Sequence, residues 1–96
     1  VIVHHTIQEQ DLWILYGHLN ADSTANCPAG KTVSKGEIIA WLGDKDDNGG
    51  WPPHLHFQLS LLEPHTHNLP GVVHPDDRDR ALRDFPDPRL VLGALY

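Results

Sequence analysis

The sequence contains little cysteine and no long apolar segment. Cys27 is the only cysteine among the 96 residues, so neither an internal disulfide nor a multi-cysteine zinc site can form. Next to Pro28, this thiol is expected to be inert. No run of eighteen apolar residues is present, so no membrane span is expected, and no signal-peptide pattern opens the chain. The chain begins at Val1 without methionine, as expected of a fragment, a processed form or a trimmed version, which leaves its compartment unknown.

Positive charge is also scarce. Seven Lys and Arg residues stand against thirteen Asp and Glu, and the net charge of −6 argues against a nucleic-acid binder. Hydrophobic residues make up 40% and charged residues 21%, proportions that argue against global disorder. At 96 residues the chain is one domain or part of one.

Short apolar runs separated by Gly, Pro and polar residues predict a mostly β protein. Two of the runs flank the turn-like segment Gln8–Asp11 and are expected to form an antiparallel hairpin. Pro75, followed by acidic residues, predicts one short helix over Asp76–Asp84. The predicted strands are Val1–His5, Leu12–Leu19, Glu37–Leu42 and His54–Leu62. We therefore expect a small antiparallel sheet or open barrel at residues 1–62, followed by an irregular tail with a short helix at residues 63–96.

Two histidines one residue apart lie in the last predicted strand. Residues two apart on a strand point to the same face, so His54 and His56 would project together while Leu55 and Phe57 face the core. Two imidazoles on one face beside a loop suit metal binding or proton transfer. The alternative is two surface histidines on a half-exposed strand.

Three motifs, in order along the chain, carry a resemblance to a known family. They are "LYGHL" at 15–19, "AGKTVSKGEIIAWLG" at 29–43 and "PHLHFQL" at 53–59. Together they resemble the lysostaphin-type zinc metallopeptidases, also called LytM-type or β-lytic endopeptidases. That family carries Tyr-x-His-Leu and His-Leu-His-Phe on neighbouring core strands, with a Val-x-x-Gly-x-x-Val-x-x-Gly-x-x-Ile segment between them. The resemblance covers about half of the chain.

The resemblance implies a zinc metallopeptidase acting on a peptide or on peptidoglycan. It assigns His56 as a zinc ligand and places His18 and His54 beside the zinc-bound water as catalytic groups. It also places the loop before His54 along the substrate groove, so Trp51 is a candidate groove residue, although Trp51 could equally cap the edge of the core. Tyr16 in "LYGHL" is the second candidate groove residue. Zinc lowers the pKa of its bound water toward ~7, where imidazoles exchange protons readily.

The sequence departs from the family at the other two zinc ligands. The family takes them from a His-x-x-x-Asp motif upstream of Tyr-x-His-Leu, and no such motif precedes His18. His5 and Glu9 have this spacing but fall in the expected hairpin, where a solvated turn is the alternative. One imidazole cannot hold zinc tightly, because catalytic zinc typically has three protein ligands. We expect either an incomplete peptidase domain that is inactive alone or a non-catalytic binding or spacer module.

The C-terminal part carries a second resemblance. Residues 69–93, "LPGVVHPDDRDRALRDFPDPRLVLG", resemble the segment after the peptidase-like module in proteins that also contain kinase-like and class III aminotransferase domains. That subgroup implies a spacer role in a cytoplasmic protein. A cell-wall hydrolase would instead belong to the cell envelope or be secreted.

The remaining predictions concern structure. Trp13 and Trp41 alternate with apolar neighbours and are expected in the core. The histidines of the tail are expected to be adventitious surface residues: His65, His67 and His74. A sheet that lacks the upstream strands would leave an exposed edge, so a homodimer through that edge is expected.

Overall fold

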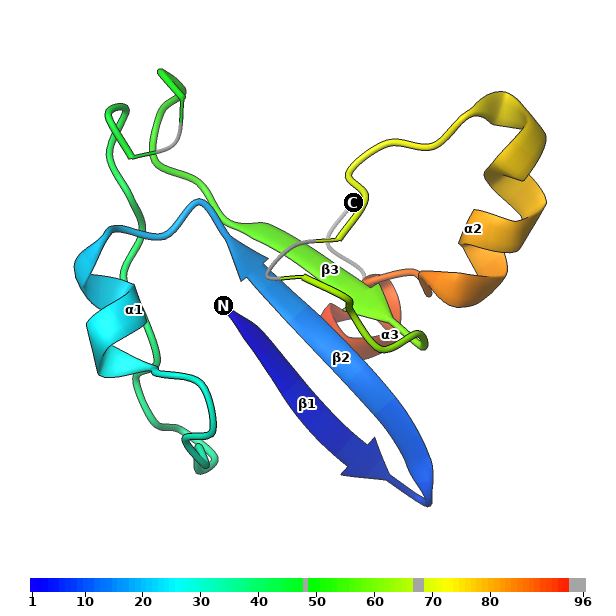
Figure 1. Cartoon of the computed structure of the whole chain (residues 1–96), viewed down its shortest axis with the longest axis horizontal. Coiled ribbons are helices and arrows are strands. Elements are labelled where there is room, and N and C mark those ends of the chain that lie inside the picture. Colours follow the sequence, from blue (N-terminus) through cyan, green and yellow to red (C-terminus); the bar gives the residue numbers. More distant parts are fainter. Residues whose placement is uncertain (48, 67–68, 94–96) are drawn as a thin grey trace. The chain divides into compact units, whose positions relative to one another are not determined.

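The computed structural model describes residues 1–47, 49–66 and 69–93. Its strands are β1 (Ile2–Ile7), β2 (Gln10–Gly17) and β3 (His56–Ser60), and its helical elements are α1 (Asp22–Asn26), η1 (Pro75–Asp77, 3₁₀), α2 (Arg78–Asp84) and α3 (Arg89–Leu92) (Figure 1). The chain divides into two compact units. The histidine unit comprises Val1 and residues 16–56, and the sheet unit comprises residues 2–15 and the described residues from 57 onward.

The three strands form one antiparallel sheet in the order β1-β2-β3 (Figure 1). In the β1–β2 hairpin, Ile2 lies opposite Leu15 and Ile7 lies opposite Gln10. The two residues between the strands, Gln8 and Glu9, have φ of 50° and 68°. Positive φ at both central positions is typical of a type I′ turn, whose twist matches that of the flanking strands. The predicted hairpin is confirmed, with a turn shorter than Gln8–Asp11.

Polar contacts join the two strands of the hairpin on its exposed face. The ring of His4 stacks on that of half-buried Trp13 at 4.8 Å between centroids. The His4 Nε2–H donates to Asp11 Oδ1 at 2.9 Å, and the Thr6 hydroxyl donates to the same oxygen at 3.2 Å. The hydrogen bond from His4 holds the pKa of Asp11 below its ordinary value. This stabilising contribution is therefore present above the ordinary carboxyl pKa and is lost as the pH falls through the lowered one.

The buried apolar core among the described residues is small and lies in the sheet unit. It consists of Ile14, Leu15, Leu59 and Leu69. Ile14 and Leu15 are consecutive in β2 and point to opposite faces of the sheet, so both faces of this central strand are covered. Ser60 in β3 is also fully buried, and its hydroxyl donates to the Leu62 carbonyl at 2.7 Å.

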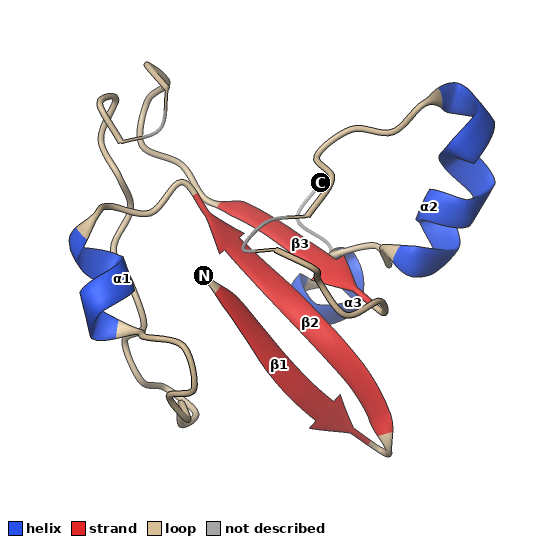
Figure 2. Cartoon of the chain, viewed as in Figure 1, coloured by secondary structure: helices blue, strands red, loops and turns tan. Residues whose placement is uncertain are grey.

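The predicted C-terminal helix is confirmed as α2, which follows η1 at Pro75. His74 caps this start, because its Nδ1 accepts the Asp76 amide hydrogen at 3.2 Å. The short helices α1 and α3 lie where the sequence predicted a loop and an apolar end. None of the described helices is long and apolar enough to cross a membrane. The chain is thus a small three-stranded antiparallel sheet with a short C-terminal helix and extensive loops (Figure 2).

The predicted strand Glu37–Leu42 is wrong. The segment is a loop (Figure 1). An isolated antiparallel bridge joins Leu42 to Leu19. Trp41 is 48% exposed, so its predicted place in the core is also wrong. The apolar run resembles a strand, yet only at Leu42 does another backbone segment pair with it in a β bridge.

Side chains of α1 form hydrogen bonds with backbone groups of residues 37–42 that a neighbouring strand would otherwise bind. The Asn26 side-chain amide donates to the carbonyl oxygens of Ile38 and Ile39 at 3.2 and 2.9 Å. The Trp41 amide donates to the Ser23 hydroxyl oxygen at 2.9 Å. Since side chains satisfy these backbone groups, the segment remains extended without joining the sheet.

The predicted strand His54–Leu62 is shorter in the structure, where β3 spans His56–Ser60. His54 and Leu55 precede it, directly after Pro52 and Pro53, which have no amide hydrogen to donate to a ladder. Leu55 is 46% exposed, so its predicted position against the core is wrong.

Strand β1 is at the edge of the sheet, since its sequence neighbour β2 occupies the centre. An edge strand offers backbone groups for pairing with another chain, and we expect the protein to dimerise through β1. Light scattering in the tens of micromolar range measures this directly. A monomer at those concentrations would contradict the prediction.

Candidate functional site

Three histidines converge within the histidine unit. The ring centroids of His18 and His54 lie 4.5 Å apart with an interplanar angle of 38°, and those of His18 and His56 lie 5.8 Å apart at 37°. His18 and His56 are half-buried, whereas His54 is exposed. His18 follows β2 and His56 opens β3, so the ends of two strands bring together residues far apart in the sequence. Solvent can therefore reach the cluster through His54.

Gly17 permits this close approach. A Cβ atom built at Gly17 would lie 3.0 Å from the His56 Cβ, closer than nearly all real Cβ contacts. The glycine in "LYGHL" therefore leaves the space that the His56 side chain occupies. Any larger residue at this position would move His56 relative to His18.

His18 departs from the strand in an uncommon backbone conformation. Its φ of 61° lies in the left-handed region, which costs a non-glycine residue roughly 1–2 kcal/mol. Such conformations persist only where the surroundings hold them, and they cluster at functional sites. The predicted strand Leu12–Leu19 ends at Gly17 for this reason.

The hydrogen bonding of His54 fixes its neutral tautomer. Its Nδ1–H donates to the Pro52 carbonyl oxygen at 2.7 Å. Since a carbonyl can only accept, the neutral ring carries its proton on Nδ1 and its lone pair on Nε2. His54 can thus accept a proton at Nε2 and pass it on.

The candidate groove residues differ in their surroundings. Tyr16 is half-buried on β2, and burial raises the pKa of its phenol, which therefore stays neutral and able to donate a hydrogen bond. Trp51 lies in the loop before His54 and is 67% exposed, which suits a surface loop better than a cap over the core.

The metal-binding side chains of the described residues are not gathered into a group of three. Within residues 1–47, 49–66 and 69–93, no group of three or more His, Cys, Asp or Glu side chains is placed to hold a metal ion. His5 lies in β1 with a buried Nε2 that has no hydrogen-bond partner, while Glu9 is exposed in the type I′ turn. Glu9 therefore lies in a solvated turn, which was the alternative to its being a zinc ligand.

The tail histidines make no comparable cluster in the described part of the chain. His65 is exposed, and His74 is exposed and caps η1. His67 lies outside the described residues.

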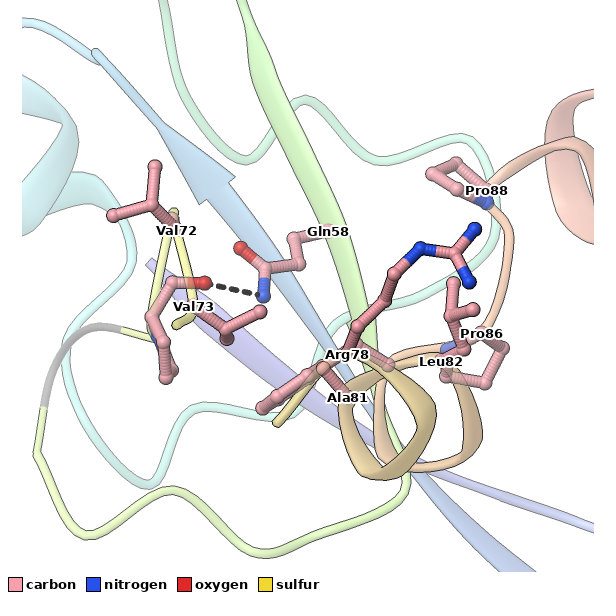
Figure 3. Close-up of a pocket in the computed structure, with 11 residues that line it drawn as sticks. Gln58, Val72, Val73, Arg78, Ala81, Leu82, Pro86 and Pro88 are labelled. Atoms are coloured by element: carbon pink, nitrogen blue, oxygen red, sulfur yellow. Dashed lines mark hydrogen bonds between the residues drawn. The ribbon is translucent and has the colours of Figure 1, made fainter. Parts of the chain in front are cut away.

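The sheet unit has an apolar cavity of about 270 Å³ (Figure 3). Most of its lining comes from residues 70–73, helix α2 and residues 85–88. Gln58 and Arg78 are its polar members, and the Gln58 side-chain amide donates to the Pro70 carbonyl at 3.0 Å. The lining residues that the structure describes include no histidine, carboxylate or thiol, so this cavity offers no group for acid–base chemistry near neutral pH.

Ser23 connects Asn20, two residues after His18, with Trp41 in the segment that pairs with Leu19. It is 1% exposed; its hydroxyl donates to Asn20 Oδ1 at 2.8 Å and its oxygen accepts the Trp41 amide hydrogen. The sequence signal for Ser23 is only its place three residues after Asn20 in an expected loop. Its partner Trp41 could not be inferred from spacing.

Replacing Ser23 with alanine is expected to cost about 1–3 kcal/mol of local stability, because the Trp41 amide loses its acceptor. Amide hydrogen exchange at Trp41 reports this as a loss of protection of roughly 10–100-fold. Ser34→Ala, at an exposed position in the same unit, serves as the control. Equal protection of Trp41 in the two variants would contradict the role assigned to Ser23.

No family model matches the chain, and neither a curated protein nor a solved structure is significantly similar to it.

Proposed function

We propose that this chain supplies the downstream part of a lysostaphin/LytM-type zinc metallopeptidase domain, with peptide or peptidoglycan as the substrate class. In this proposal His56 is a metal ligand, and His18 and His54 are the groups that exchange protons with the reacting atoms. The two zinc ligands that the family takes from His-x-x-x-Asp would come from outside these 96 residues or from a partner. The chain by itself is then inactive.

The convergence of three histidines is the observation that carries the proposal. The family motifs "LYGHL" and "HLHF" are separated by 34 residues in the sequence, counted from Leu19 to His54, yet their histidine rings lie within 4.5–5.8 Å of one another. Adventitious surface histidines have no reason to meet in this way. The left-handed backbone at His18 supports the same interpretation, because strain of this kind concentrates at functional sites.

The chemistry proposed for the chain's own residues follows from the geometry of His54. Its Nδ1–H is held by the Pro52 carbonyl, so Nε2 is the atom that takes a proton from a nucleophile and returns it to a leaving amine. His18, in ring contact with both other histidines, is placed to stabilise negative charge on the attacked carbonyl oxygen. Half-buried Tyr16, whose phenol is neutral near pH 7 and whose pKa burial raises further, is a candidate donor to the substrate backbone.

A second function is favoured by the incomplete ligand set. Because the described residues include no three-ligand group, the chain also fits a non-catalytic binding or spacer module within a multidomain protein of the aminotransferase type. In that case the histidine cluster would be a remnant of the peptidase site.

Supplying the missing ligands tests the proposal. The 96-residue sequence is joined to the upstream strands of a LytM-type peptidase that carry His-x-x-x-Asp, and hydrolysis of purified peptidoglycan is measured. We expect hydrolysis that falls at least ~100-fold in His54→Ala and is abolished in His56→Ala. His65→Ala, at an exposed tail position, is the matched control and should retain full activity.

Two outcomes would count against the peptidase assignment. The first is a joined protein that binds zinc yet leaves peptidoglycan intact, which would favour the spacer module. The second is hydrolysis that His54→Ala leaves unchanged, which would remove His54 from the site.

A further inference from the structure

His18 is one of three non-glycine residues with positive φ among those the structure describes, and the other two form the β1–β2 turn. A hairpin turn explains Gln8 and Glu9, but His18 lies at the end of a strand where nothing in the local sequence demands this conformation. Its surroundings must therefore hold it.

Residues 41–43 provide that support. The Gly43 amide donates to the His18 carbonyl oxygen at 2.9 Å, and the Asn20 amide donates to the Trp41 carbonyl at 2.9 Å. Between these two bonds, Leu19 and Leu42 form the isolated bridge. The peptide groups on the C-terminal side of His18 are thus fixed by a short antiparallel contact within the histidine unit.

Position 43 accepts only a residue without a side chain. Gly43 is buried, and a Cβ atom built there would lie 3.0 Å from the His18 carbonyl oxygen and 3.1 Å from that of Leu19. It would also lie 2.7 Å from the Asp47 Cβ, a separation that real Cβ atoms essentially never show. Two of these three neighbours are backbone atoms, which cannot rotate away as a flexible side chain can.

We propose that Gly43 is a positioning residue for His18: its amide hydrogen bond holds His18 in the left-handed conformation that brings the imidazole into contact with His54. The catalytic meaning of this contact rests on the proposed function, whereas the positioning itself does not. An added methyl group at position 43 would push away the His18–Leu19 peptide. His18 would then relax to negative φ, and its ring would leave His54.

Nuclear magnetic resonance on three forms of the chain tests this inference: the unchanged sequence, Gly43→Ala and Gly36→Ala. Gly36 is the matched control, because its φ of 81° makes alanine unfavourable there while nothing lies within 4 Å of the added atom. The readouts are the sign of φ at His18, from its amide–Hα coupling and intraresidue Overhauser effect, and the Overhauser effect between the His18 and His54 rings. The stacked pair His4–Trp13 reports that the sheet unit remains folded.

We expect positive φ and the ring contact in the unchanged chain and in Gly36→Ala, and the loss of both in Gly43→Ala with the His4–Trp13 contact retained. A folded Gly43→Ala variant that keeps both features would overturn the inference. Loss of both in Gly36→Ala to the same extent would overturn it as well.

A double variant covers the case in which Gly43→Ala fails to fold. In Gly43→Ala/Asp47→Gly the shortest contact is removed, but the contacts with the His18 and Leu19 carbonyl oxygens remain. We expect the His18–His54 contact to be absent there too. If the His18–His54 contact is present in the double variant, glycine is required at position 43 because of Asp47 and not because of the His18 backbone.

Kinetic measurements on the joined protein, in which the 96-residue sequence follows the upstream strands of a LytM-type peptidase, separate this inference from the proposed function. Gly43→Ala should lower kcat by roughly 10–100-fold with KM unchanged, because misplacement of a catalytic group by about 1 Å costs rate more than binding. Loss of the ring contact without any change in kcat would sustain the positioning by Gly43 and contradict the catalytic role of His18.

Discussion

Zinc is expected to bind the isolated chain at least about 1,000-fold more weakly than it binds a site with three protein ligands. This factor corresponds to about 4 kcal/mol of binding free energy. The physical reason is the ligand set: in the proposed assignment His56 is the single zinc ligand in this sequence, and the described residues include no group of three that could hold a metal. With a single imidazole as protein ligand, water molecules must occupy the other coordination positions of the zinc ion, and the ion dissociates easily.

Competition with a chromophoric chelator measures this affinity, with His56→Ala and His65→Ala compared with the unchanged chain. We expect the chelator to remove all zinc in every case. One tightly held zinc per chain that disappears in His56→Ala would contradict the prediction. It would show that further ligands complete the site, either His5 and Glu9 or residues of a second chain.

Leu59→Ala is expected to destabilise the protein by about 2–5 kcal/mol, enough to unfold a large fraction of a domain of this size. Leu59 is 2% exposed on β3 and is one of four buried apolar residues in the part of the chain that the structure describes. With so few buried side chains, little neighbouring structure can collapse into the cavity that alanine leaves.

Urea unfolding followed by tryptophan fluorescence measures this loss. Leu90→Ala is the matched control, because Leu90 in α3 is 78% exposed and its truncation should change stability by no more than about 0.5 kcal/mol. A Leu59→Ala variant as stable as Leu90→Ala would show that the core lies elsewhere.

The hairpin and the C-terminal helix could be predicted from the sequence, because both are determined by residues close to one another along the chain. The apolar runs on either side of the polar, turn-like residues near Gln8 were sufficient to predict the hairpin, because a short turn between two strand-forming runs pairs them antiparallel. Pro75 and the acids after it marked the start of the C-terminal helix, where proline and negative charge are both favourable.

The structure of residues 37–42 depends on contacts with residues distant in the sequence, which the sequence pattern could not predict. The apolar run 37–42 has the composition of a strand, but side chains of Ser23 and Asn26 bind its backbone, and Trp41 and Leu42 remain about half exposed. Composition cannot show which partner will satisfy a backbone amide. His54 likewise lies just outside β3, after two prolines, although it was expected within the strand.

The sequence indicated which histidines to examine together, and their roles as metal ligand and catalytic groups stay predictions. The motifs around His18, His54 and His56 single out these histidines, and the structure places their rings together. Gly43 ends the motif "AGKTVSKGEIIAWLG" and Ser23 lies in none, but neither position in the sequence revealed a contact with the segments next to His18. Their contacts arise between segments about twenty residues apart.

The central claim is that His18, His54 and His56 form one cluster in the folded chain. Overhauser contacts between selectively labelled histidine rings measure this most directly. We predict contacts from His18 to both His54 and His56. A folded chain that retains the His4–Trp13 stack but shows no contact between His18 and His54 would contradict the account.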